Sequence, residues 1–141
     1  MMLRKFALVL IALPLLAGCS GFPGWVRLMR PAPVHSSDWT GDPARGDTIF
    51  HHGKNEAPPC STCHQTVKGA FGFALGPNLA EVGTRAASRI DGMTAAEYIT
   101  DSILHPKHFV VPGYQDIMYP DFAKHFSPQD VADLVAYLLT L

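Results

Sequence analysis

Two cysteines and a histidine stand close together at Cys60, Cys63 and His64, in the order Cys-Ser-Thr-Cys-His. Thiols and imidazoles are the side chains that bind transition metals, exchange disulfides or anchor a porphyrin. At this spacing both thiols can add to vinyl groups on one edge of a haem, and the next residue can bring its imidazole onto the iron. We therefore predict one covalently attached haem c, with His64 as the proximal iron ligand.

Two other uses of these thiols are weaker. A structural zinc site needs two further ligands at short spacing, and the only other cysteine of the sequence is Cys19, far upstream. A thioredoxin-like redox pair needs a βαβ surround, and the neighbouring sequence lacks strand-like alternation. Covalent haem attachment is the interpretation that the pattern favours.

The first nineteen residues have the pattern of an export signal. Arg4 and Lys5 precede an apolar run over 6–16, and Leu-Ala-Gly-Cys follows, ending at Cys19. This order is similar to a bacterial lipoprotein signal, whose cleavage-site cysteine carries lipid. An ordinary small-residue cleavage site is the alternative, but it leaves Cys19 unexplained. We predict a signal peptide over 1–18 and a protein anchored by lipid at Cys19, facing the periplasm or the cell exterior.

The rest of the sequence divides into a tether and one domain. Residues 19–40 are rich in Gly, Pro and Ser, which predicts a lipidated tether, and 41–141 suit a single domain. The 141 residues carry 11 basic and 12 acidic side chains, a formal net charge of −1. That balance gives no electrostatic basis for binding nucleic acid.

Helix-start and helix-stop residues predict three main helices. The first covers about 43–52 and ends at Gly53, and the second covers about 94–105 and ends before Pro106. The third begins at Ser127 and carries an apolar stripe through Leu139. We found no hairpin signal, so we expect an all-α fold in which long loops pack on the haem.

Several short motifs together resemble one family. They are Gly41-Asp42-Pro43-Ala44-Arg45-Gly46 leading to Ile49-Phe50, the 60–64 segment, Gly76-Pro77-Asn78-Leu79, Gly113-Tyr114, Met118-Tyr119-Pro120 and Ala136-Tyr137-Leu138. The stretch from about Asp42 to Leu141 is similar to the class I monohaem cytochromes c. The resemblance implies that the first and last helices cross, with Gly46 or Phe50 against Tyr137. It also implies that the Pro77 carbonyl accepts a hydrogen bond from His64.

The family pattern places the sixth iron ligand at Met118, and His/Met ligation raises the reduction potential. Tyr119 stands between this methionine and Pro120, a small departure from the commonest form. The competing ligands are Met93, His105, His108 and His125, of which each histidine is more often solvated or hydrogen-bonded. We expect Tyr114, with Phe71, Phe73, Leu75 and Leu79, to line the haem pocket.

With both axial positions filled, no place remains for a substrate, so we expect an electron-transfer protein and not an enzyme. Its partners would be membrane electron donors and acceptors of a respiratory or photosynthetic chain, with Lys54, Lys68 and Lys107 near the haem edge. The 113–118 and 137–141 segments resemble haem domains of quinol-oxidising or terminal-oxidase complexes, including the small haem lipoprotein of alternative complex III. A haem enzyme or gas sensor with an open or labile sixth position is the alternative.

Overall fold

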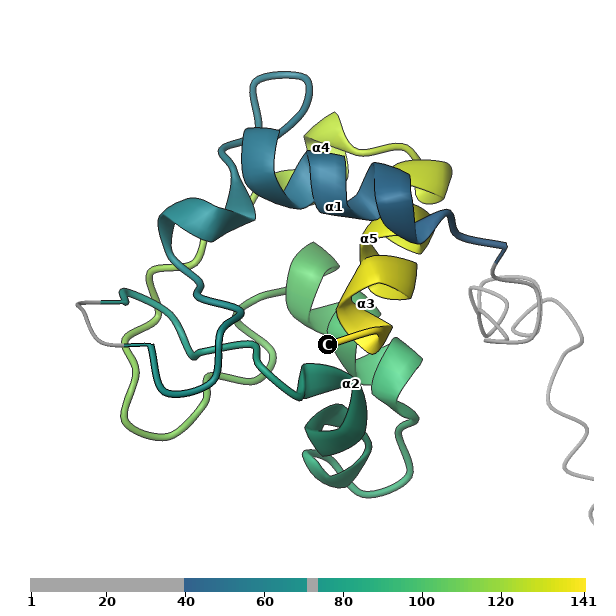
Figure 1. The fold of residues 1–141 in the computed structure, drawn as a ribbon. Coiled ribbons are helices and arrows are strands. Elements are labelled where there is room, and N and C mark those ends of the chain that lie inside the picture. The colour runs from purple at the N-terminus through teal and green to yellow at the C-terminus, as the bar shows by residue number, and fades with distance from the viewer. Residues whose placement is uncertain (1–39, 71–73) are drawn as a thin grey trace, which may run out of the picture. The chain divides into compact units, whose positions relative to one another are not determined.

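The computed structural model describes residues 40–70 and 74–141 (Figure 1). Their elements, in chain order, are α1 (Pro43–His52), a 3-10 turn (Cys60–Thr62), α2 (Val82–Arg85), a second 3-10 turn (Ala86–Ser88), α3 (Ala95–Leu104), α4 (Phe122–His125) and α5 (Pro128–Leu139). No strand occurs among these residues, which confirms the all-α prediction. The signal peptide, Cys19 and nearly all of the tether lie outside the described residues, as do Phe71 and Phe73.

The three predicted helices are the three long ones, and their ends lie where the capping residues predict. The Asp42 side chain accepts hydrogen bonds from the backbone N–H groups of Ala44 and Arg45, and Gly53 ends α1 with a φ of 69°. Thr94 and Glu97 form the predicted capping box of α3. The short helices α2 and α4 were not predicted, because four residues are too few for an apolar period to show.

Ser127 begins α5 with a second capping box, whose acidic member is Asp130. The Ser127 hydroxyl accepts from the Asp130 N–H, and the Asp130 carboxylate accepts from the Ser127 N–H at 2.9 Å. The same carboxylate pairs with Lys54, which follows α1 in the chain. The start of α5 is therefore fastened to the end of α1.

Helices α1 and α5 cross closely, and a glycine makes the crossing possible (Figure 1). A Cβ at Gly46 would collide with the Asp133 carbonyl and lie 2.7 Å from the Cβ of Tyr137. One turn later, the rings of Phe50 and Tyr137 meet with their centroids 5.4 Å apart. The expected contact of Gly46 and Phe50 with Tyr137 is thus present.

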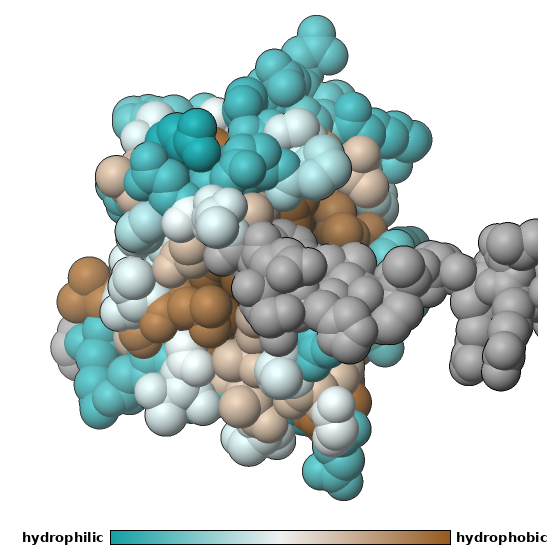
Figure 2. Space-filling model, turned by 90° about the vertical axis from the view of Figure 1, so that its right-hand side faces the viewer, coloured by the Kyte–Doolittle hydropathy of each residue, from teal (hydrophilic) through white to brown (hydrophobic). Residues whose placement is uncertain are grey.

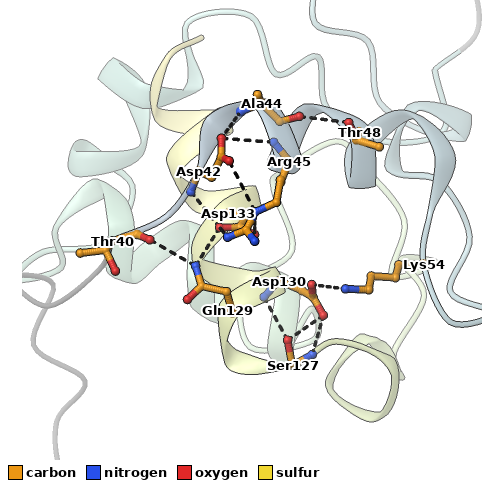
Figure 3. A network of polar contacts seen from close by, with 10 residues as sticks. All are labelled: Thr40, Asp42, Ala44, Arg45, Thr48, Lys54, Ser127, Gln129, Asp130 and Asp133. Carbon is orange, nitrogen blue, oxygen red and sulfur yellow. Dashed lines mark hydrogen bonds and ion pairs between the residues drawn. The ribbon is translucent and has the colours of Figure 1, made fainter.

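A polar network joins α1 and α5 at this crossing (Figure 3). Asp133 of α5 is 1% exposed and accepts hydrogen bonds from the Asp42 N–H at 2.8 Å and from the Gln129 side chain at 2.9 Å. The Arg45 guanidinium of α1 pairs with the same carboxylate, with Nε 3.1 Å from Oδ2. A buried charge is tolerated only when it is paired and hydrogen-bonded in this way.

The pKa values of the two buried carboxylates respond to these partners. Burial alone would raise the pKa of Asp133, but the Asp42 amide, Gln129 and Arg45 hold it below the ordinary value. For Asp130, hydrogen bonds from Lys54 and Ser127 likewise outweigh burial and lower the pKa. Both groups are therefore charged at neutral pH and stabilise the folded chain in that form.

Apolar residues from all three long helices form one core, which includes Ile49, Phe50, Ile99, Leu134 and Val135. The core therefore includes the apolar side chains at the α1–α5 crossing. The described segments 63–70 and 74–80 and the loop over 105–121 lie on the left in Figure 1. Within the described part of the chain, no helix is both long and apolar enough to cross a membrane.

Candidate haem-binding site

The 3-10 turn at Cys60–Thr62 brings the two thiols and the imidazole to one side of the chain. The N–H groups of Cys63 and His64 both donate to the Cys60 carbonyl, at 3.1 and 3.0 Å. All three side chains line the same cavity. Local hydrogen bonding thus achieves the juxtaposition that the spacing predicts.

The orientation of the His64 ring is set by the Gly76-Pro77 segment. Nδ1 of His64 donates to the Pro77 carbonyl at 2.8 Å, because a carbonyl oxygen can only accept. The expected hydrogen bond is therefore present, and Nε2 carries the free lone pair. Burial lowers the pKa of His64, so the ring is neutral at pH 7 and suited to bind a metal.

Gly76 leaves the space that the imidazole occupies. A Cβ at this position would collide with Cε1 of His64 and lie 2.8 Å from its Nδ1. The Gly76 N–H donates to the Cys63 carbonyl at 3.0 Å, which ties the segment directly to the cysteine turn. Any larger residue at position 76 would push the ring out of this place.

Arg85 of α2 braces the segment that follows, a role that the sequence analysis missed. Its Nη2 donates to the carbonyls of Asn78 and Ala80, at 2.9 and 2.7 Å. The loop that carries Pro77 is therefore held on its far side by a guanidinium. An arginine seven residues from its partner in an irregular loop leaves no periodic signal, so sequence reasoning had no means of finding it.

The cavity has a volume of about 210 Å³. A single water needs only ~10–15 Å³, so the space is sized for a much larger group. Tyr114, Leu75, Leu79 and Met118 line it, as the sequence analysis expects. The walls also include unpredicted residues, namely Tyr98, Ile99, Ser102 and Ile103 of α3, with Arg85 and Arg89.

Several apolar side chains that line the cavity are exposed to solvent, unlike the buried apolar side chains of the core. Figure 2 draws the side that lies to the right in Figure 1, where apolar patches lie among polar residues. Four of the six large apolar side chains found exposed in the described part of the chain, Leu75, Val110, Tyr114 and Ile117, line the cavity. A flat apolar group in the cavity would cover them, which is the fit that a porphyrin requires.

The geometry weighs against the alternative uses of the thiols. Burial raises the pKa of the Cys60 thiol to about 11, whereas a reactive redox pair needs a lowered value. Cys60, Cys63 and His64 are not among the groups of described residues whose ligand atoms converge as a metal site. The thiols and imidazole therefore suit attachment to a prosthetic group better than zinc or disulfide exchange.

The competing iron ligands lie elsewhere. Within the described residues, none of Met93, His105, His108 and His125 lines the cavity. His105 and His108 turn toward Asp101, and His125 meets the Tyr119 hydroxyl at 2.8 Å. Met118 is half-buried and faces the cavity that also holds His64.

The three lysines expected near the haem edge each have an acidic partner. Lys54 pairs with the buried Asp130, Lys68 with Glu81 at 3.0 Å, and Lys107 with Asp116 at 3.8 Å. Lys54 therefore has a structural role in joining α1 to α5. Lys68 and Lys107 form exposed pairs, which contribute little to stability.

Comparison with known proteins decides the family. The family model described as Cytochrome c matches residues 43–141. The chain belongs to the cytochrome c family. This membership implies a covalently bound haem c and an electron-carrier function, and it agrees with the residues that line the cavity. Family members transfer electrons and are in general not enzymes.

One curated relative of this cytochrome c is a diheme cytochrome c-type protein of Cereibacter sphaeroides, 31% identical over 152 residues. The alignment covers 93% of this chain and 46% of the relative, so the chain spans less than half of the relative's length. The printed sequence contains a single Cys-x-x-Cys-His segment.

Proposed function

We propose that this cytochrome c is a one-electron carrier with a single haem, bound through Cys60 and Cys63, and with His64 and Met118 as the iron ligands. One observation carries the proposal: the four side chains line one cavity, and the His64 ring is fixed there by the Pro77 carbonyl. No other methionine or histidine of the described residues lines that cavity. The pairing of an imidazole with a thioether therefore has the strongest geometric support.

Each residue has a definable task in that role. When bound, the haem supplies an iron that alternates between the ferric and ferrous states. His64 is neutral because burial lowers its pKa, so its Nε2 is available as a ligand. Met118 offers a soft sulfur, which favours ferrous iron and raises the reduction potential. The apolar walls keep water from the iron and so reduce the reorganisation that accompanies electron transfer.

The test is an anaerobic redox titration of the haem-loaded protein with carbon monoxide added at the end. We expect one electron per chain with a single midpoint, and slow uptake of carbon monoxide by the ferrous form because Met118 fills the sixth position. Rapid uptake would instead favour the haem enzyme or gas sensor with an open or labile sixth position. More than one midpoint would contradict a single haem.

We further propose that the cytochrome is anchored by lipid at Cys19 and serves as a subunit of a membrane-attached respiratory or photosynthetic complex, facing the periplasm or cell exterior. The lipoprotein-like sequence up to Cys19 supports the anchor, and the resemblance at 113–118 and 137–141 supports the complex. Extraction with mild detergent followed by native sizing tests the second part. Migration with membrane electron donors or acceptors is expected, whereas a small monomer would indicate a mobile carrier.

A further inference from the structure

Three side chains outside the haem cavity converge on the surface at the end of α3. Nδ1 of His105 lies 2.8 Å from Oδ1 of Asp101, and Nδ1 of His108 lies 3.2 Å from the same oxygen. The ligand atoms of all three residues lie within 4.8 Å of one another. None of the three lines the haem cavity, so the cluster does not belong to the site described above.

The backbone holds the cluster in place. The His105 N–H donates to the Asp101 carbonyl at 2.7 Å and closes the last turn of α3, and the His108 N–H donates to the His105 carbonyl at 2.9 Å. Buried Pro106 restricts the backbone between the two histidines. The imidazole rings stack with centroids 4.7 Å apart and planes 16° apart. Three donors are thus presented on one rigid corner of the chain.

We infer that Asp101, His105 and His108 form a binding site for a divalent transition-metal ion of the Zn²⁺ type. Metal bonds of ~2.0–2.2 Å at tetrahedral angles place neighbouring ligand atoms about 3.3–3.6 Å apart, so the His108 contact at 3.2 Å is near that spacing and the His105 ring needs only a small outward movement from 2.8 Å. Two imidazole nitrogens with one carboxylate oxygen suit Zn²⁺ and exclude a dedicated Ca²⁺ or Mg²⁺ site, which uses oxygen ligands. The histidine side chains are 55% and 63% exposed, so water can enter and complete the coordination.

A hydrogen-bonded Asp–His pair is the simpler interpretation of the contact between Asp101 and His105. The chain contains another such pair for comparison. Asp47 and His51 in α1 have the same spacing as Asp101 and His105, and their ion pair spans 3.1 Å. The α3 cluster differs because a second imidazole, from beyond the helix, reaches the same carboxylate oxygen. Lys107 stands between the two histidines in sequence, and its ammonium pairs with Asp116. The Lys107 charge is therefore balanced by Asp116 and does not stand unpaired beside the three donors.

Isothermal titration with Zn²⁺ tests the site. The titrated protein carries haem, because free cysteine thiols would themselves bind zinc. It has no histidine tag, because the tag would bind zinc as well. Zinc does not change the oxidation state of the haem iron. We expect one Zn²⁺ per chain in the wild type, and an affinity at least about tenfold lower in His108→Gln and in Asp101→Asn. The control is His51→Gln, which removes the histidine of the comparison pair and should bind like the wild type.

Thermal unfolding gives a second readout that does not depend on calorimetric heats. Zn²⁺ should raise the melting temperature of the wild type and of His51→Gln, and leave that of His108→Gln unchanged. Unaltered haem absorption in each variant shows that it is folded. Binding weaker than about 1 mM in the wild type, or equal binding by His108→Gln and the wild type, would overturn the inference. Loss of binding in His51→Gln would also overturn it, because the site would then lie on α1.

Discussion

The His64 ring donates a hydrogen bond to the carbonyl of Pro77, which lies thirteen positions later in the sequence, at 2.8 Å. This contact links the haem-attachment turn to the segment that the Arg85 guanidinium braces. It fixes the ring before any metal is bound, and such outer partners of a ligand tune the metal as well as orient the ligand.

Gly76→Ala should displace the His64 ring, because the added methyl group collides with it. We expect a ferric absorption spectrum that departs from the wild type and a lower yield of folded, haem-loaded protein. The matched control is Gly69→Ala. Its Cβ meets nothing within 4 Å, but the φ of 70° adds backbone strain. A wild-type spectrum in Gly76→Ala would contradict displacement of the ring, and an altered spectrum in Gly69→Ala would show that the spectrum responds to changes away from His64.

Gly46→Ala should weaken the α1–α5 crossing, because the new Cβ runs into the Asp133 carbonyl and the Tyr137 side chain. Overpacking of this kind typically costs about 1–3 kcal/mol, which a guanidinium chloride unfolding curve of the haem-loaded protein can measure. Thr48→Ala, on the exposed side of the same helix, should stay within about 0.5 kcal/mol of the wild type. Equal losses in both would argue against a close crossing at Gly46.

Asp133→Asn should reduce the free energy of unfolding by about 2 kcal/mol at pH 7, because it removes a charged acceptor from Arg45, Gln129 and the Asp42 amide. The folded-state pKa of Asp133 lies below its unfolded value. Its contribution is therefore complete above an ordinary aspartate pKa of about 3.9 and is lost as the pH falls through the lowered value.

Unfolding curves between pH 7 and pH 2 should consequently show a shallower acid loss in Asp133→Asn than in the wild type. Asp130 and Lys54 keep part of the pH dependence in both proteins. Asp91→Asn, a change at an exposed carboxylate, serves as the control and should follow the wild type. A wild-type slope in Asp133→Asn would mean that this carboxylate contributes no acid sensitivity.

Cys19→Ala should release the cytochrome from the membrane fraction of cells that express the full sequence, because the proposed lipid has no other attachment point. Fractionation followed by haem staining measures the distribution, and Ser20→Ala is the control that leaves the cysteine intact. An unchanged membrane fraction in Cys19→Ala would contradict the anchor, provided that native sizing shows no partner complex holding the chain.

The sequence could predict features that depend on residues close together in the chain, but not those that depend on residues far apart in it. The roles expected of Cys60, Cys63 and His64 depend on spacing within five residues, and the limits of α1, α3 and α5 depend on capping side chains next to each helix end. The pairing of Arg45 with Asp133 joins residues 88 positions apart, and that of Lys54 with Asp130 joins residues 76 positions apart. No local pattern encodes such partners, so they emerge only when α1 and α5 cross.

The clustering of the histidines beyond α3 could be predicted from the sequence only in part. His105 lies four residues after Asp101, a spacing that places both on one helix face and was available to sequence reasoning. The third member, His108, joins the cluster because the turn at Pro106 folds it back. A turn of this geometry has no unique sequence signature, so the convergence of three donors required the fold.

The most direct test of His64/Met118 ligation is the visible spectrum of the ferric, haem-loaded cytochrome, examined for the weak long-wavelength band of methionine sulfur bound to iron. We expect the band in the wild type and in Met93→Ala, whose methionine lies away from the cavity, and its loss in Met118→Ala. Absence of the band in the wild type, or its survival in Met118→Ala, would contradict the account.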